Sequence, residues 1–276
     1  MISRRELRAR LNLPKRRVKE GCVEVFESHN FQRGFGNWGD HISAEIVAHY
    51  SKVVPAVCSD PLVAGKTLVV GSVMSHAMPG DSVWGAGCIA PGAVGFSRGK
   101  MKVYAVRGPL TLKELRKCHN VPNVPFGDPA LLMRSMHKFP TNSITHEYGV
   151  IPHWVDYDLP VIKRLSELGM KIIDIRQSTS KMLDELSNVR KVLSSSLHGL
   201  ILSDAMNLPN GRVQFSSNVI GGDFKFQDYC QSVGRRHVNH PLDQHCSIQK
   251  IERIALNDSI EWDADAILNK APWNAE

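Results

Sequence analysis

Apolar and polar residues follow one another along this chain in short blocks that predict strands and helices in alternation. The strand-like blocks are β-branched or otherwise apolar runs at 23–26, 67–73, 83–87, 102–106, 148–151, 171–175, 189–193 and 212–215. Helix-like blocks lie between them at 40–50, 109–118, 160–168, 179–186 and from 198 onward. Strands that alternate with helices of this length predict βαβ units and a mostly parallel sheet.

The number of strands exceeds what one compact sheet holds in a chain of 276 residues. A polar stretch at 136–145, which contains Pro140, separates two series of blocks. We therefore predict an α/β fold with two Rossmann-like domains, at 21–138 and 139–250, that face a central cleft. A basic arm at 1–20 precedes them, and a helical tail at 251–276 follows.

The positive charge is concentrated in the predicted arm. The formal net charge is +7, and the first 20 residues carry eight basic and two acidic side chains. Such an arm could contact an anionic membrane surface or an acidic partner, or it could be a solvated leader. The remaining chain is nearly neutral, which argues against a nucleic-acid-binding domain.

The composition is that of a soluble cytoplasmic protein. No apolar run reaches the roughly 18 residues of a membrane span, and none follows the basic N-terminus as in a signal peptide. The six cysteines are widely spaced without a CxxC pair, which is typical of reduced thiols. His237, His240, His245 and Cys246 match no standard zinc spacing, so we predict no metal site.

One histidine stands where a strand gives way to a helix. His198 follows the apolar run 189–193 within the sequence Ser-Ser-Leu-His-Gly and precedes the run 200–205. The carboxyl ends of strands in open α/β sheets bind ligands, and a helix N-terminus favours anions. His198 is therefore either a proton donor to an anionic substrate or a structural, capping histidine.

Two further strand ends carry residues suited to anions. The loop 33–40 has three glycines in seven residues and then opens a helix, with Asp40 as a candidate N-cap. It matches neither a dinucleotide-binding fingerprint nor a P-loop, so it predicts an anion loop or simply a tight turn. Arg107 follows the strand 102–106 and could grip a phosphate or carboxylate, or pair with a protein carboxylate.

Six short motifs occur in an order that resembles the polysaccharide pyruvyl transferase family, especially its bacterial exopolysaccharide members that form ketals. They are Gly-Asn-Trp-Gly-Asp at 36–40, Val-Arg-Gly-Pro at 106–109, Gly-Asp-Pro-Ala at 127–130, Pro-His-Trp at 152–154, Ser-Leu-His-Gly at 196–199 and Phe-Lys-Phe-Gln-Asp-Tyr at 224–229. The resemblance implies a GT-B-like pair of Rossmann domains, phosphoenolpyruvate as donor, and a glycan acceptor that gains a cyclic pyruvate ketal.

The resemblance also assigns candidate donor-binding residues. Many members of the family have Arg two residues before the motif histidine, where this chain has Ser196. We therefore expect the missing positive charge to come from Arg107 or Lys225. The full predicted donor-binding set is Arg107, Lys225, Gly36, Asn37, Gly39 and Ser196.

Ketal formation requires protonation of the donor's methylene carbon, and His198 is the predicted acid. A bound anion would raise the pKa of His198. His153 could deprotonate the acceptor, or it could be structural beside Trp154. Asp128 is either a base or, as we favour, a turn residue. Trp38 and Trp84 could stack on a sugar, although core packing is usual for a lone Trp.

Other functions remain open at this level. A GT-B nucleotide-sugar glycosyltransferase would share the fold, and a non-catalytic sugar-binding or assembly protein of the polysaccharide machinery would need neither His198 nor Arg107. For the transferase we expect no cofactor or metal beyond the co-substrate phosphoenolpyruvate. We expect it to act in surface-polysaccharide or capsule synthesis in the cytoplasm, with the basic arm allowing contact with the inner face of the membrane.

Overall fold

The computed structural model describes residues 16–19, 22–28, 37–96, 99–254, 256 and 259–274, and within them it contains two five-stranded parallel sheets. The first sheet has the order β3-β2-β5-β6-β7, formed by Ala56–Cys58, Glu24–Phe26, Thr67–Leu68, Ser82–Trp84 and Lys102–Ala105. The second has the order β12-β11-β10-β8-β9, formed by His240–Pro241, Asn210–Gln214, Val189–Ser194, His146–Ile151 and Lys171–Ile172. A separate parallel pair joins β1 (Arg16–Arg17) to β4 (Val63–Ala64).

Crossover segments connect the parallel strands of both sheets, and many of these segments are helical. The α-helices are α2 (Ser43–Ser51), α3 (Pro109–Arg116), α4 (Met133–Met136), α5 (Pro160–Glu167), α6 (Thr179–Leu186), α7 (Leu197–Ala205), α8 (Phe224–Ser232), α9 (Ile248–Glu252) and α10 (Ala264–Leu268). Short 3-10 turns are η2 (Trp38–Asp40), η3 (Met74–His76), η4 (Pro129–Leu132) and η5 (Trp154–Asp156). Helices α3 and α5 both begin at a proline, which is favoured there because the first helical N–H has no partner.

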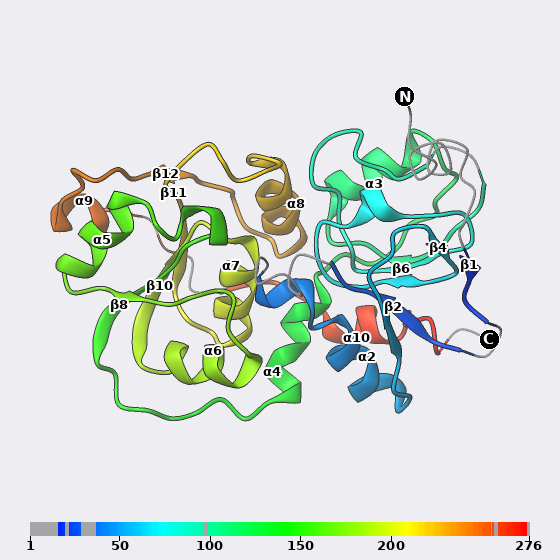
Figure 1. The fold of residues 1–276 in the computed structure, drawn as a ribbon, viewed down its shortest axis with the longest axis horizontal. Helices are drawn as coiled ribbons and strands as arrows, with labels where there is room; N and C mark the ends of the chain where they lie inside the picture. Colours follow the sequence, from blue (N-terminus) through cyan, green and yellow to red (C-terminus); the bar gives the residue numbers. More distant parts are fainter. Residues whose placement is uncertain are drawn as a thin grey trace.

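The two sheets share one hydrophobic core. A single buried cluster includes Val25 and Trp84 from the first sheet, Val192 from the second, and Leu200 from α7. Two smaller clusters belong mainly to one half each. Figure 1 shows the first sheet, around β2 and β6, on one side and β8, β10 and β11 on the other, with α8 beside α3. The halves are therefore packed against each other through apolar side chains.

The C-terminal segment returns to the first half of the molecule. Trp84 Nε1 donates a hydrogen bond of 2.9 Å to the backbone oxygen of Ile267 in α10, and its ring meets that of Trp273 edge-on. In Figure 1, α10 lies beside α2. The chain thus crosses between the halves twice, once at 133–146 and once after α9.

The predicted α/β class with parallel sheets is confirmed, whereas several predicted boundaries are wrong. The predicted strand 67–73 ends at Leu68 in the structure, and Gly71, with a φ of +98°, excludes an extended strand that continues to 73. The helix predicted at 40–50 is split, because Asn37 and Asp40 close η2 with a capping box before α2 begins. Strand β3 and helix α8 were missed. The GT-B-like arrangement and the domain boundaries stay predictions, and most of the basic arm lies outside the described residues.

Within the described part of the chain, no helix combines the length and apolar character that crossing a bilayer would need. All six cysteines are free thiols.

Candidate active site

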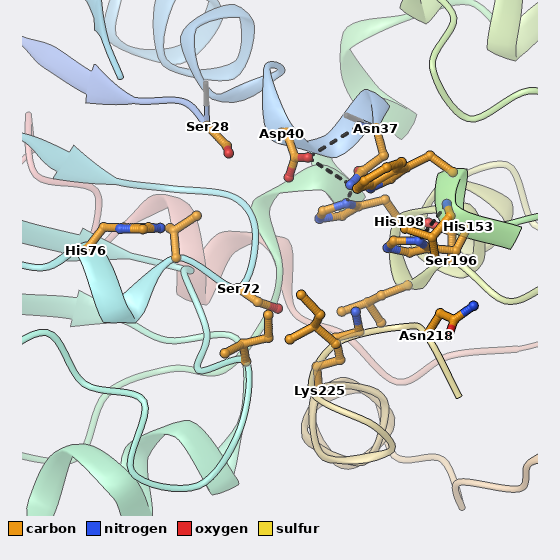
Figure 2. A pocket seen from close by; sticks show the side chains of 16 residues that line it. Ser28, Asn37, Asp40, Ser72, His76, His153, Ser196, His198, Asn218 and Lys225 are labelled. Carbon is orange, nitrogen blue, oxygen red and sulfur yellow. Dashed lines mark hydrogen bonds between the residues drawn. The ribbon is translucent and has the colours of Figure 1, made fainter. Parts of the chain in front are cut away.

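A cavity of about 200 Å³ lies between the two halves. Figure 2 shows side chains from both halves that face one another across it. Its polar lining consists of Ser28, Asn37, Asp40, Ser72 and His76 from the first half and His153, Ser196, His198, Asn218 and Lys225 from the second. Val73, Ile89, Trp154, Val155, Leu197 and Ile220 add apolar surface.

The lining residues follow the carboxyl ends of parallel strands. Ser28 comes two residues after β2, His153 two residues after β8, and Ser196 two residues after β10. Ser196 is also the N-cap residue of α7 and makes no side-chain capping hydrogen bond. The cavity thus lies at the sheet edge that the sequence predicted as the ligand site, beside the N-terminus of α7, whose first N–H groups have no partner within the helix.

The orientation of His198 is fixed by Asn37 from the other half. The two side chains meet at 2.5 Å between His198 Nδ1 and Asn37 Oδ1. Asn37 Oδ1 also accepts the Gly39 N–H at 3.0 Å, and Asn37 Nδ2 donates to Asp40 Oδ2 at 2.9 Å. Because this amide oxygen can only accept, His198 Nδ1 carries the hydrogen, and Nε2 of the neutral ring is a proton acceptor.

Burial determines the charge of His198. Its environment lowers the pKa of His198 to about 3, mainly through desolvation and then through the positive charges of Lys225 and Arg107. The imidazole is therefore neutral at pH 7 in the structure. Its Nε2 is buried and has no hydrogen-bond partner among the described residues, and His198 lines the cavity. The sequence prediction of a charged His198 thus requires the negative charge that a bound donor would bring.

Lys225, the second residue of α8, places a cation at the same cavity. Its side chain is buried, and this burial, together with Arg107 and Arg212, lowers the pKa of Lys225 to about 8, against a smaller opposing effect of Asp40. Within the described residues, its ammonium group has no hydrogen bond or ion pair, only the Phe226 ring at 5.5 Å. A buried cation without a partner favours an anionic ligand.

His153 also lines the cavity, but the hydrogen-bonding roles of its two ring nitrogens are the reverse of those in His198. Its Nδ1 accepts the Val155 N–H at 3.4 Å as the N-cap of η5, which leaves the proton of the neutral ring on Nε2. Burial, with a smaller effect of Lys225, lowers the pKa of His153 to about 3. The site therefore presents one imidazole that accepts a proton and one that donates a hydrogen bond.

Arg107 lies behind the cavity wall rather than in its lining. The guanidinium is fully buried and its Nε donates to Asp228 Oδ2 at 3.0 Å. Its two terminal nitrogens donate to Ser72 Oγ at 2.7 Å and to the Cys88 backbone oxygen at 2.6 Å. In this arrangement Arg107 reaches the cavity only through Ser72, and its predicted contact with the donor stays a prediction.

The remaining predicted residues are dispersed. Asp128 caps η4 through Ala130 N–H and lies outside the lining, and burial raises its pKa to about 6. Trp38 donates to Thr179 Oγ1 and, like Trp84, is buried in the core, so neither is among the described lining residues. Gly39 stands directly behind the His198 ring, and Gly36 lies outside the described residues.

Sequence reasoning missed several lining residues, chiefly Ser28, Ser72, His76 and Asn218. Ser72 carried a signal, because Gly-Ser closes the predicted strand at 67–73. Asn218 carried none, since it lies in an irregular loop. No group of three or more His, Cys, Asp or Glu side chains suited to a metal ion occurs in the described part of the chain.

The comparisons with known proteins agree with the motif resemblance. The family model described as polysaccharide pyruvyl transferase matches residues 99–210. The succinoglycan biosynthesis protein ExoV of Rhizobium meliloti (strain 1021) is 26% identical over 133 residues, which cover 48% of this chain and 40% of that protein. The uncharacterized protein L143 of Acanthamoeba polyphaga mimivirus is 27% identical over 231 residues, 80% of this chain and 79% of that protein. No solved structure gave a significant match.

The chain is therefore similar to polysaccharide pyruvyl transferases in the segment that contains β7, β8, β10 and α7. That segment contributes His153, Ser196 and His198 to the cavity.

Proposed function

We propose that the protein transfers the pyruvyl group of phosphoenolpyruvate to a sugar of a surface polysaccharide or its precursor and forms a pyruvate ketal. The observation that carries the proposal is the cavity itself. Lys225, whose ammonium group has no hydrogen bond or ion pair among the described residues, and His198 Nε2, which has no hydrogen-bond partner among them, belong to residues that line the same cavity in a chain similar to pyruvyl transferases. The paired parallel sheets support, at a coarser level, the GT-B-like arrangement that we propose with it.

The donor carries a phosphate and a carboxylate, so its site needs positive charge and oriented N–H groups. Lys225, one of the two cations that the sequence suggested, supplies the charge that many members of the family obtain from an Arg at the position of Ser196. The Ser72 and Ser196 hydroxyls and the N–H groups at the start of α7 are candidates for the phosphate oxygens. His153 Nε2–H is suited to the carboxylate. With the donor bound, its negative charge raises the pKa of His198 and makes proton uptake easier.

The first step is addition of an acceptor hydroxyl across the donor double bond. The His198 imidazolium delivers a proton from Nε2 to the methylene carbon, which becomes a methyl group and leaves C2 electrophilic. The acceptor hydroxyl oxygen then bonds to C2, and its proton passes to His198 Nε2. The geometry thus adds a base role to the acid role that the sequence predicted. Asn37 accepts the hydrogen bond from His198 Nδ1 throughout, so Nε2 is the nitrogen that gives and takes up the proton.

The second step closes the ketal. Phosphate leaves C2, the second sugar hydroxyl attacks the same carbon, and the hydroxyl proton is released with the phosphate. One donor and one diol therefore give one ketal and one inorganic phosphate. No step needs a metal ion, and we propose a cytoplasmic protein because its donor is a cytoplasmic metabolite.

The test is to incubate the protein with phosphoenolpyruvate and candidate glycan extracts, with and without EDTA. We expect phosphate release in equal amount to a glycan mass gain that corresponds to a ketal, and no effect of EDTA. Phosphate release without glycan modification would exclude the transferase. A thermal shift with UDP- or GDP-sugars but none with phosphoenolpyruvate would favour a glycosyltransferase.

A further inference from the structure

Asp156 is a buried carboxylate that the proposed mechanism does not use. It is the last residue of η5, which follows β8, and its side chain is fully buried. Its Oδ2 accepts a hydrogen bond of 3.0 Å from Ser195 Oγ, directly after β10, and its Oδ1 accepts one of 2.5 Å from Ser216 Oγ, two residues after β11. One carboxylate thus joins the carboxyl ends of three neighbouring strands of the second sheet.

The Ser195 hydroxyl connects this carboxylate to His153. Its oxygen accepts the backbone N–H of His153 at 2.8 Å, while its hydrogen is donated to Asp156. A hydroxyl group has one hydrogen and two lone pairs, so the bond to Asp156 leaves a lone pair for the His153 N–H. Ser195 is 2% exposed, and water therefore competes little for either bond. Asp156 thus fixes the backbone from which the imidazole reaches the cavity.

The Ser216 hydroxyl makes the same kind of connection on the other side. Its oxygen accepts the backbone N–H of Asn218 at 3.0 Å, while its hydrogen is donated to Asp156. The loop after β11 contributes Asn218 and Ile220 to the cavity lining, and Figure 2 shows Asn218 and His153 in the same view of the cavity. Two segments of the lining are therefore held by one carboxylate.

The backbone bond of His153 is shorter than the bond that holds its ring. The ring accepts the Val155 N–H through Nδ1 at 3.4 Å, against 2.8 Å for the bond to Ser195. Burial is also the main cause of the low pKa of His153, so the ring is neutral only in this place. A shift of the backbone would therefore change both the position of Nε2–H and the charge of the imidazole.

We propose that Asp156 is a positioning residue: through Ser195 it holds His153 where Nε2–H can bind the carboxylate of phosphoenolpyruvate, and through Ser216 it holds the adjacent loop. Asp156 is not among the described residues that line the cavity, so it acts only through these serines. The inference rests on the proposed function, because the donor is the ligand that His153 would bind.

Asp156→Asn separates the effect of position from the effect of charge. An amide has one acceptor oxygen, so at most one of Ser195 and Ser216 can still donate to it. Removal of a negative charge would by itself favour the binding of an anion. Weaker binding of phosphoenolpyruvate to Asp156→Asn would therefore report the displacement of His153.

Nitrogen-15 NMR of the histidine rings is a readout that needs no ligand. His153 of the wild type should be neutral at pH 5 with its hydrogen on Nε2, because its pKa is about 3. In Ser195→Ala and Asp156→Asn we expect this pKa to rise toward 6.5, since a displaced ring gains contact with water. Ser216→Ala should leave the ring signals unchanged and instead speed amide hydrogen exchange at Asn218.

Calorimetric titration with phosphoenolpyruvate measures the effect on donor binding. Ser195→Ala and Asp156→Asn should weaken it by roughly ten- to hundredfold, as expected for loss of one hydrogen bond to a charged group. Ser195→Thr keeps the hydroxyl and should restore the affinity, because Ser195 also lines a cavity of about 140 Å³ with space for a methyl group. Ser187→Ala is the matched control: its hydroxyl bridges Asn142 and the Asp184 backbone oxygen, and it is not among the described lining residues.

The inference is overturned if His153 stays neutral at pH 5 in both Ser195→Ala and Asp156→Asn, or if its ring is displaced while phosphoenolpyruvate affinity is unchanged. It is also overturned if Ser187→Ala weakens the donor equally, because lost stability would then account for the effect. Should Asp156→Asn not fold, Ser195→Ala decides, since it removes no charge. If the wild type does not bind phosphoenolpyruvate but the ring signals change as expected, the donor proposal fails and the positioning of His153 by Asp156 stands.

Discussion

At the scale of single residues, His198 is the side chain on which the proposed chemistry depends. Replacement by Gln keeps a polar side chain of similar size but removes the group that takes up a proton. We expect His198→Gln to lower turnover by about 10²- to 10⁴-fold, the usual contribution of general acid–base catalysis. Phosphoenolpyruvate affinity should change little, because Lys225 remains. Turnover close to that of the wild type in a folded variant would make His198 a structural residue.

The same variant reports the protonation state of His198. Its pKa in the folded protein, about 3, lies below the 6.5 of the unfolded chain, so the unfolded chain binds the proton more readily. The wild type should therefore lose stability relative to His198→Gln as pH falls below 6.5, by about 1.4 kcal/mol per pH unit. Asp40 and Asp128, whose pKa values burial raises to about 6, act in the opposite direction but are common to both proteins. Urea unfolding between pH 7 and pH 4.5 measures the difference, and parallel curves would contradict it.

Lys225 should give donor binding an alkaline limit. Its pKa of about 8 means that the free protein loses this positive charge above pH 8. We expect kcat/KM for phosphoenolpyruvate to fall there by about tenfold per pH unit. Lys225→Arg should abolish this fall, because a guanidinium stays charged. Lys163→Arg, on an exposed face of α5, is the matched control, and its kcat/KM should still fall above pH 8. If kcat/KM of Lys225→Arg falls above pH 8 as it does in the wild type, Lys225 does not belong to the donor site.

At the scale of elements, the site depends on how closely η2 approaches α7. Gly39 makes this possible, because a Cβ atom there would lie 2.1 Å from Cγ of His198. We expect Gly39→Ala to push the imidazole away from Asn37 and to lower turnover about a hundredfold, as small displacements at a reacting centre do.

Gly169→Ala is the control for the Gly39 variant. Gly169 has a φ of +83°, and a Cβ atom there would meet no other atom within 4 Å, so the substitution adds only backbone strain, away from the site. It should cost about 1 kcal/mol of stability and leave turnover intact. Turnover and unfolding curves measured side by side separate the two effects. Equal turnover in both variants would show that the contact between η2 and α7 does not position His198.

At the scale of the whole molecule, a buried ion pair joins the halves. Asp228 of α8 accepts hydrogen bonds from Arg107 Nε and from the backbone N–H and hydroxyl of Thr111 in α3. Asp228→Asn leaves the Arg107 charge buried without its counterion, which should lower the free energy of unfolding by about 3–5 kcal/mol. Glu147→Gln, in an exposed pair with Arg190 and Lys191, should cost less than about 1 kcal/mol. Urea unfolding tests both, and similar costs would show that the pair contributes little to joining the halves.

Local pattern was enough to predict the architecture of the sheets and the place of one catalytic candidate. The alternation of apolar runs with helical segments predicted parallel sheets, because parallel strands need a crossover between them. The polar residues after the run 189–193 placed His198 at the end of a strand, and the structure puts it at the cavity. These inferences succeed because the periodicity of side chains and the chemistry of turns act over a few residues.

The protonation states and the partners of the site were decided only by the tertiary structure. Asn37 and His198 are 161 residues apart, and Arg107 and Asp228 are 121 apart, so no local pattern pairs them. The sequence shows a histidine and a lysine, but only burial beside other cations makes the first neutral and lowers the pKa of the second. It likewise shows Trp38 and Trp84 without showing that both are enclosed in the core. Desolvation and charge–charge interaction depend on which distant segments meet, and folding, not sequence order, decides that.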